Sequence, residues 1–167
     1  MLKITEIKKE EAVQALELIH EVYREILEKS WFSLDGDKEL LGYMTGTGFA
    51  LKAVEESKIA AVFVARTTNL GEENLGKYLN LSPEEMREVA HMEIAMVRAA
   101  YRGQGLQKRM MQEAETRLKE AGYHYLMGTA HPENVYSVNN FKRLGYEIVA
   151  EDLKYGGLPR CIFCKRI

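Results

Sequence analysis

This sequence has few prolines, few cysteines and almost no excess of charge of either sign. Its 167 residues include three prolines and two cysteines, and 23 lysines and arginines against 25 acidic residues leave a formal net charge of -2. Two cysteines are too few for a disulfide framework. The balanced charge lacks the basic surface that nucleic-acid binding requires, and no apolar run approaches the roughly 18 residues of a membrane-spanning helix. We therefore expect neither nucleic acid nor a membrane as a partner.

The composition that is present is typical of one folded domain. Hydrophobic residues make up 46% of the chain and charged residues 29%, and a chain of this length buries enough apolar surface for a single core. The first residues alternate between apolar and polar and lack the layout of a signal peptide. We expect a single domain over residues 1–167, located in the cytoplasm.

The two cysteines, Cys161 and Cys164, have the spacing of half a zinc site. A zinc site needs four ligands, and no second pair accompanies them. The surrounding residues have a strand pattern, in which a separation of three places the two side chains on opposite faces. We expect no metal here.

Hydrophobic periodicity predicts strands alternating with helices along the chain. The predicted strands cover residues 2–7, 48–54, 58–66, 90–97, 123–130, 146–150 and 160–165, and the predicted helices cover 10–28, a stretch ending near 46, a short turn after Ser82, 106–121 and 133–144. This order indicates an α/β or α+β fold. Hairpins near both ends of the chain indicate that its sheet is mixed.

A glycine-bearing turn, Arg102-Gly103-Gln104-Gly105, joins a predicted strand to the long predicted helix. Backbone N–H groups at a helix start have no partners within the helix, and with the positive end of the helix dipole they bind phosphate oxygens. Glycine lets the backbone approach a pyrophosphate without a Cβ in the way. The turn lacks the Gly-Lys-Ser/Thr ending of a nucleoside-triphosphate loop and the third glycine of a dinucleotide fold.

Two blocks of sequence together resemble the GNAT superfamily of acyl-CoA-dependent N-acetyltransferases. The first is the turn itself, which fits Arg/Gln-x-x-Gly-x-Gly/Ala, and the second is Asn134-x-x-Ser137-Val138-x-x-Phe141-x-x-x-Gly145-Tyr146. They occur in the superfamily's order and separation. The resemblance implies a single-domain mixed sheet of six to seven strands, mostly antiparallel with a splayed parallel pair, flanked by about four helices.

The resemblance also implies acetyl-CoA as cosubstrate. The implied cofactor-binding residues are Ala95, Met96 and Val97 on the strand, Arg102, Gly103, Gln104, Gly105, Leu106, Gln107 and Lys108 in the turn and helix start, and Asn134 and Phe141 in the second block. Two of them depart from the superfamily pattern. Gln107 replaces a glycine or alanine, and Phe141 replaces a tyrosine that protonates the departing thiolate in many members.

Acetyl transfer to an amine needs a base, because an alkylammonium with a pKa near 10.4 is not a nucleophile at neutral pH. Glu93 is our candidate, since alternation places it on the face of Ala95 and Val97, with His91 two residues earlier on that face. A carboxylate in a partly apolar cleft has a raised pKa suited to this work. The alternatives are an ion pair for Glu93 and a core position for His91. Tyr136 is a further candidate, as proton donor in place of Phe141.

We therefore predict an N-acetyltransferase that moves the acetyl group of acetyl-CoA directly onto an amine of a small molecule or peptide. Acidic and aromatic residues within 31–37 and 151–155 suit a cationic amine. One alternative is an acyl-CoA-binding module without catalysis, favoured by Phe141, and another is a protein-interaction domain of the same fold. The segment 67–90 is a candidate lid or oligomer contact, and a homodimer is compatible with each of these functions.

Overall fold

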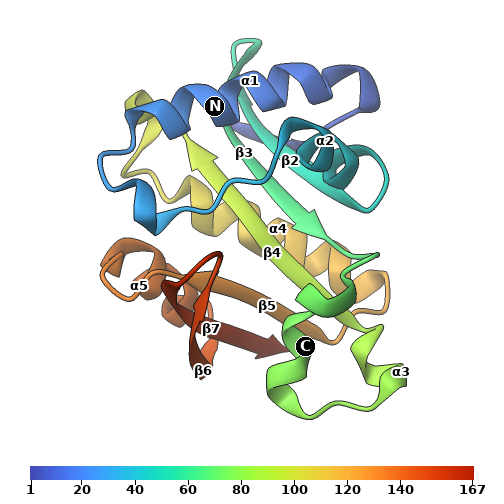
Figure 1. Ribbon diagram of the computed structural model, residues 1–167. Coiled ribbons are helices and arrows are strands. Elements are labelled where there is room, and N and C mark those ends of the chain that lie inside the picture. Colours follow the sequence, from blue (N-terminus) through green and yellow to red (C-terminus); the bar gives the residue numbers. More distant parts are fainter.

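The computed structural model describes all of residues 1–167, and seven strands form one sheet in the order β1-β2-β3-β4-β5-β7-β6 (Figure 1). The strands are β1 (Lys3–Glu6), β2 (Gly48–Glu55), β3 (Lys58–Arg66), β4 (Val89–Val97), β5 (Tyr125–Ala130), β6 (Glu147–Lys154) and β7 (Leu158–Arg166). Every neighbouring pair is antiparallel except β4 and β5, which are parallel. The predicted mixed sheet with one parallel pair is confirmed.

Helices cover both faces of the sheet. They are α1 (Ala12–Glu25), α2 (Asp37–Thr45), α3 (Pro83–Met86), α4 (Leu106–Glu120) and α5 (Val135–Arg143). In Figure 1, α1 and α2 lie in front of the strands and α4 lies behind them. None of these helices has the length and apolar character needed to cross a membrane.

Two apolar clusters fill the space between the sheet and these helices. The cluster on the α4 side contains Phe63, Phe141 and Phe163 together with the buried stripe of α4. That stripe, Leu106, Met110, Ala114 and Leu118, is the one that the four-residue spacing predicts. The cluster on the α1 and α2 side contains alternate residues of β3 with residues of both helices. An apolar cluster therefore packs on each face of the sheet.

The segment after β3 is part of the core, which its polar sequence did not predict. It forms two short 3₁₀-helices, η3 (Gly71–Glu73) and η4 (Leu75–Leu79). Leu70 and Leu75 are buried in a third cluster with Val89, Met127 and Ile162. This part of the segment 67–90, the candidate lid or oligomer contact, therefore packs against β4, β5 and β7. Cys164 joins this cluster, whereas Cys161 packs in the α4-side cluster, so the cysteines lie on opposite faces as expected.

The parallel ladder between β4 and β5 is short. Val89, Ala90 and His91 pair with Tyr125, Leu126 and Met127, and the pairing stops there. β4 continues to Val97 and β5 to Ala130, so the remaining residues of both strands diverge. The fold thus contains a wedge-shaped opening in the middle of its sheet.

Candidate active site

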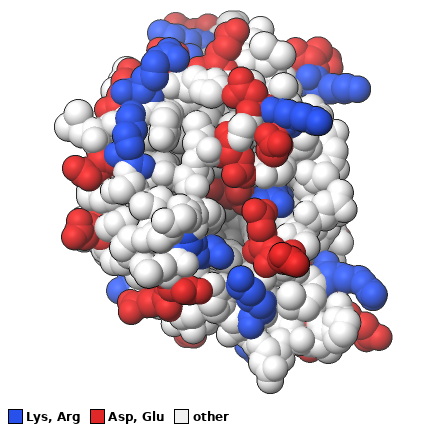
Figure 2. Space-filling model, viewed as in Figure 1, with Lys and Arg blue, Asp and Glu red and all other residues white.

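A cavity of about 350 Å³ occupies this opening. Its lining comes from the α1–α2 loop, from β3, β4 and β5, from η3 and η4, from α4 and α5, and from the β6–β7 region. Figure 2 shows it as a hollow in the middle of the face that carries α1 and α2, with acidic and basic side chains around its rim. Segments from both halves of the chain therefore meet at one place.

A β-bulge in β4 decides which way Glu93 points. Val64 pairs with Ile94 and Ala65 pairs with Met92, so Glu93 is the extra residue between two ladder positions. Ala95 and Val97 pack with the α4-side cluster, whereas Glu93 approaches Arg66 and His91 on the other face. The prediction that Glu93 shares a face with Ala95 and Val97 is wrong, because strict alternation does not allow for the bulge.

Glu93 lies in surroundings that oppose its negative charge. One carboxylate oxygen is 3.8 Å from Nη1 of Arg66, the other is 4.0 Å from Nδ1 of His91, and the side chain is 22% exposed. Burial raises the pKa of Glu93 to about 7, the charges of Asp35 and Glu73 act in the same direction, and Arg66 opposes them. The carboxyl group is therefore able to accept a proton near neutral pH.

His91 stands beside Glu93 but does not have a free basic nitrogen. Its ring is buried, and Nε2 accepts a hydrogen bond from the backbone N–H of Leu75 at 3.0 Å. The proton of the neutral ring therefore sits on Nδ1, the nitrogen that faces Glu93. Burial lowers the pKa of His91 to about 3, helped by the charges of Arg66 and Lys154, so the ring stays neutral at pH 7.

Arg66 connects three groups at the wall of the cavity. Its guanidinium donates to Glu73 at 2.9 Å, lies 3.8 Å from Glu93 and stacks over the ring of Tyr43. Its Nε is buried without a hydrogen-bond partner. The arginine ends the apolar run of β3, and a charge at the end of such a run is the sequence signal that identifies it. Arg66 was not among the residues predicted from the sequence.

The glycine-bearing turn before α4 has the geometry of an anion cradle. Gly103 and Gly105 have φ values of +80° and +72°, and a Cβ on either would meet no atom within 4 Å. The backbone N–H groups of Gly103 to Lys108 make no hydrogen bond within the chain. Arg102, Gly103, Gln104, Gly105 and Lys108 are exposed, Leu106 is buried in the core, and Gln107 reaches the cavity. The donors are thus free for a ligand.

The strand and second-block residues flank the same opening. Ala95, Met96 and Val97 pair with β3 along one edge of β4, which leaves the other edge toward the opening, and Ala95 and Met96 line the cavity. Asn134 also lines it and caps α5, accepting from the backbone N–H of Ser137 at 3.3 Å. Ala95, Met96 and Asn134 therefore line one cavity, and Val97 lies at the end of the same free edge of β4.

Phe141 and Tyr136 have very different positions. Phe141 is buried, lines the cavity and stacks on Phe163 with ring centroids 4.6 Å apart. Tyr136 is 63% exposed at the start of α5 and is not part of the cavity lining. Tyr136 is therefore wrongly placed to act on a group inside the cavity, because it projects from another face of the helix.

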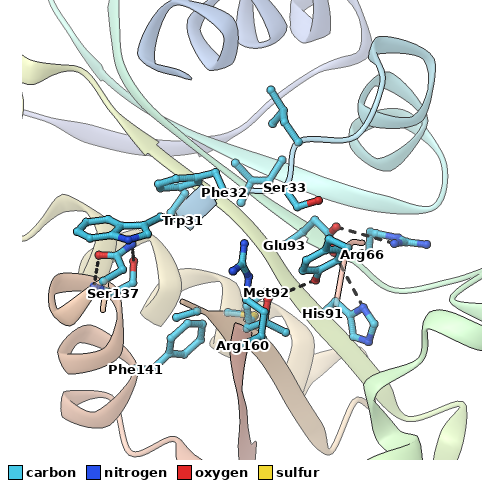
Figure 3. Close-up of a pocket in the computed structure, with 18 of the residues that line it drawn as sticks. Trp31, Phe32, Ser33, Arg66, His91, Met92, Glu93, Ser137, Phe141 and Arg160 are labelled. Atoms are coloured by element: carbon cyan, nitrogen blue, oxygen red, sulfur yellow. Dashed lines mark hydrogen bonds and ion pairs between the residues drawn. The ribbon is translucent and has the colours of Figure 1, made fainter. Parts of the chain in front are cut away.

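Of the residues expected to bind the acceptor amine, some line the cavity and others lie outside it. Trp31, Phe32, Asp35 and Tyr155 line the cavity, whereas Asp37, Glu151 and Asp152 do not. Figure 3 shows Glu93, Arg66 and His91 together on one side, Trp31 and Phe32 on the other, and Arg160 pointing between them. Arg160 was also missed in the sequence, although it stands as an isolated charge in an otherwise apolar stretch of β7.

Comparisons with known proteins agree with this geometry. A family model described as the acetyltransferase (GNAT) family matches residues 10–146. No curated protein sequence matches the chain. Among solved structures, the ribosomal-protein-S18-alanine N-acetyltransferase of Escherichia coli has a TM-score of 0.73 at 14% identity, with 100% of this chain and 94% of that chain covered.

Two further structures have the same fold. A GNAT-family acetyltransferase of Streptococcus pneumoniae has a TM-score of 0.73 at 21% identity, with 100% and 99% of the two chains covered. A putative acetyltransferase of Salmonella typhimurium, solved with acetyl-CoA, has a TM-score of 0.70 at 15% identity, with 99% and 94% covered. At these identities the likeness establishes the shared fold.

Proposed function

The chain belongs to the acetyltransferase (GNAT) family, and from this premise we propose that it transfers the acetyl group of acetyl-CoA directly onto an amine. One observation carries the proposal. A carboxyl group with a pKa of about 7 and an unpaired set of backbone N–H donors flank the same opening in the sheet.

The free donors before α4 suit the pyrophosphate of the cosubstrate. Backbone N–H groups at a helix start favour phosphate oxygens, and the open space above Gly103 and Gly105 leaves room for them. Lys108 adds positive charge in the first turn of α4. The free edge of β4 at Ala95 to Val97 supports hydrogen bonding to the amides of an extended pantetheine arm.

Glu93 is the proposed general base. Acetyl-CoA, when bound, supplies the thioester carbonyl that the amine attacks. Glu93 takes a proton from the amine, directly or through one water, and its pKa near 7 leaves a useful fraction ionised at neutral pH. Proton removal matters because the protonated amine has no lone pair to donate.

Two neighbours of Glu93 are proposed as positioning residues. His91 presents Nδ1–H toward one carboxylate oxygen, and Arg66 approaches the other. Together they favour the ionised carboxylate without fully neutralising its basicity. Phe141 has no proton to give, and since a thiol pKa near 8.5 already makes a fair leaving group, its replacement of tyrosine is compatible with turnover.

Binding of acetyl-CoA is the first test. We expect calorimetry to give a micromolar dissociation constant for acetyl-CoA and for free CoA, and none for ATP. Absence of heat and of a thermal shift, with folded protein, would contradict the proposal and favour a protein-interaction domain.

Turnover is the second test. Release of free thiol from acetyl-CoA, followed with a thiol-reactive chromophore against a panel of amines, should require an amine. Cosubstrate binding without turnover on any amine would favour the binding module without catalysis.

A further inference from the structure

Arg160 is a buried cation without an acidic partner. Its side chain lines the cavity, and the residue is 2% exposed. It donates to the carbonyl oxygens of Pro159 at 2.7 Å and Ser30 at 3.0 Å, and no carboxylate lies within ion-pair distance of it. A guanidinium retains its proton in proteins, so a full positive charge is held here.

A buried charge of this kind costs free energy unless an opposite charge meets it. The guanidinium has five N–H donors, and two backbone carbonyls satisfy only part of them. Its planar fork matches the two oxygens of a carboxylate. Figure 3 shows the group directed into the cavity, where a ligand would supply those oxygens.

A second cation of the β6–β7 region also lines the cavity. Lys154 forms no ion pair, and burial lowers its pKa. Nζ of Lys154 and the guanidinium of Arg160 lie 5.7 Å and 5.4 Å from the ring centre of Tyr155. The β6–β7 region therefore adds two cations to the cavity lining.

The cavity lining also contains carboxylates. Glu93 and Asp35 both line it, and Asp35 accepts a hydrogen bond from Tyr43 while pairing with no cation. Arg66 lines the cavity too but is already bonded to Glu73. The cavity lining thus holds, in Asp35, a carboxylate that has no paired cation and, in Arg160, a cation that has no paired carboxylate.

We propose that the acceptor is a free amino acid, with its carboxylate bound by Arg160 and its amine directed to Glu93. The inference rests on the proposed acetyl transfer and specifies its substrate class. The cavity of about 350 Å³ is also lined by the β4 and α5 residues proposed for the cosubstrate, so its remaining space suits a small acceptor. A polyamine has no carboxylate, and a peptide N-terminus has none beside its reacting amine. The cosubstrate's phosphates have their own donors before α4, and of those residues Gln107 alone reaches the cavity.

Matched acceptors test the inference. Each standard L-amino acid is compared with its α-amide and with its decarboxylated amine in the thiol-release assay. For the amino acid with the preferred side chain, we expect kcat/KM to exceed that of its amide by about 10- to 100-fold, because the amide loses a pair of charge-assisted hydrogen bonds. Equal rates with amide or amine, or transfer to no amino acid, would overturn it.

Variants of β7 separate binding from structure. Arg160→Gln should lower kcat/KM for the amino acid about 10- to 100-fold, mainly through KM, and leave both the amide rate and the dissociation constant of acetyl-CoA unchanged. Arg160→Lys keeps the positive charge and should retain part of the activity, and it replaces Arg160→Gln in the test if that variant folds poorly. The control is Arg166→Gln, on the same strand outside the cavity, which should have no effect.

The outcomes distinguish the two proposals. A variant that loses amide and amino-acid turnover equally would make Arg160 a structural anchor for the Ser30 loop, which overturns the inference. Weaker acetyl-CoA binding in Arg160→Gln would assign the arginine to the cosubstrate and also overturn it. Failure of the wild type to bind acetyl-CoA would instead remove the acetyl-transfer proposal itself.

Discussion

The charge on Glu93 is costly to the fold and useful to the chemistry. Burial and two neighbouring acids disfavour the carboxylate, while Arg66 and the Nδ1–H of His91 partly compensate. The residue type was identifiable from the sequence, since it stands four positions before Val97 in the first block. Its orientation was not, because a bulge reverses the alternation that sequence reasoning relies on.

The acid limb of the pH profile should report Glu93. A base works only when deprotonated, so kcat/KM should fall as the pH drops below about 7. Glu93→Gln should lower kcat by about 100-fold or more and remove that limb. Steady-state rates from pH 5.5 to 9 measure both effects. Glu73→Gln removes a neighbouring charge that raises the pKa of Glu93, so it should keep the acid limb but move it to lower pH, and loss of the limb in this variant would argue against Glu93.

Glu93→Gln should also stabilise the folded protein at alkaline pH. The pKa of Glu93 is about 7 in the fold against 4.5 as an ordinary value, so the folded state binds more protons between these values and stability falls as the pH rises through them. At 1.36 kcal/mol per pKa unit, Glu93→Gln should gain up to about 3 kcal/mol at pH 8. At pH 4 the gain should vanish. Urea denaturation at the two pH values measures it, and an equal gain at both would rule out this cause.

At the scale of elements, the strand–turn–helix from β4 to α4 was the most predictable part of the molecule. The apolar stripe of α4 and the glycines before it could be predicted, because a helix requires a regular apolar spacing and a left-handed turn favours glycine. The burial of η3 and η4 could not be predicted from the sequence. Leu70 and Leu75 are isolated in a polar segment, and only the apolar surface of Val89, Met127 and Ile162 explains their position.

The two ends of α4 offer a matched pair of glycines. Gly105 precedes the helix with φ +72° and Gly122 follows it with φ +94°, and a Cβ on either meets nothing within 4 Å. Alanine at each should cost roughly 1–2 kcal/mol of stability because of the left-handed backbone. Calorimetry should show weaker acetyl-CoA binding for Gly105→Ala alone. Equal affinities of the two variants would place the phosphates elsewhere.

Gly128 of β5 marks a close approach of α5 to the sheet. A Cβ there would lie 2.7 Å from Cζ of Phe141 and 3.3 Å from the carbonyl oxygen of Met92. Gly128→Ala should therefore cost about 1–3 kcal/mol through overpacking, measured by urea denaturation. Adding Phe141→Leu should recover part of this loss. Gly42→Ala in α2, where a Cβ has open space, should cost nothing, and a similar loss there would discount the clash.

For the molecule as a whole, sequence and family resemblance together anticipated the sheet and its single parallel pair. They did not anticipate the two cations of the cavity lining. Arg160 and Lys154 reach the cavity from the β6–β7 region. No local pattern predicts which side chains of distant segments converge, because their meeting depends on the packing of the complete fold.

Occupation of the opening should stabilise the entire domain. A ligand at a hundred times its dissociation constant adds about 2.7 kcal/mol to the free energy of unfolding. For a chain of this size that corresponds to a rise in Tm of roughly 5–10 °C with acetyl-CoA. Differential scanning fluorimetry measures it, with ATP as the negative control. A shift of the same size with ATP would indicate nonspecific anion binding.

The three-residue ladder between β4 and β5 also has a mechanical consequence. β1 lies at one edge of the sheet and β7 lies beyond β5, so the two ends of the chain belong to opposite halves of the molecule. A force applied to those ends loads the short ladder, which is held by fewer strand pairings than the β3–β4 or β5–β7 ladders. We expect the sheet to rupture there first under tension. A ligand that spans the opening would carry part of that load and raise the rupture force.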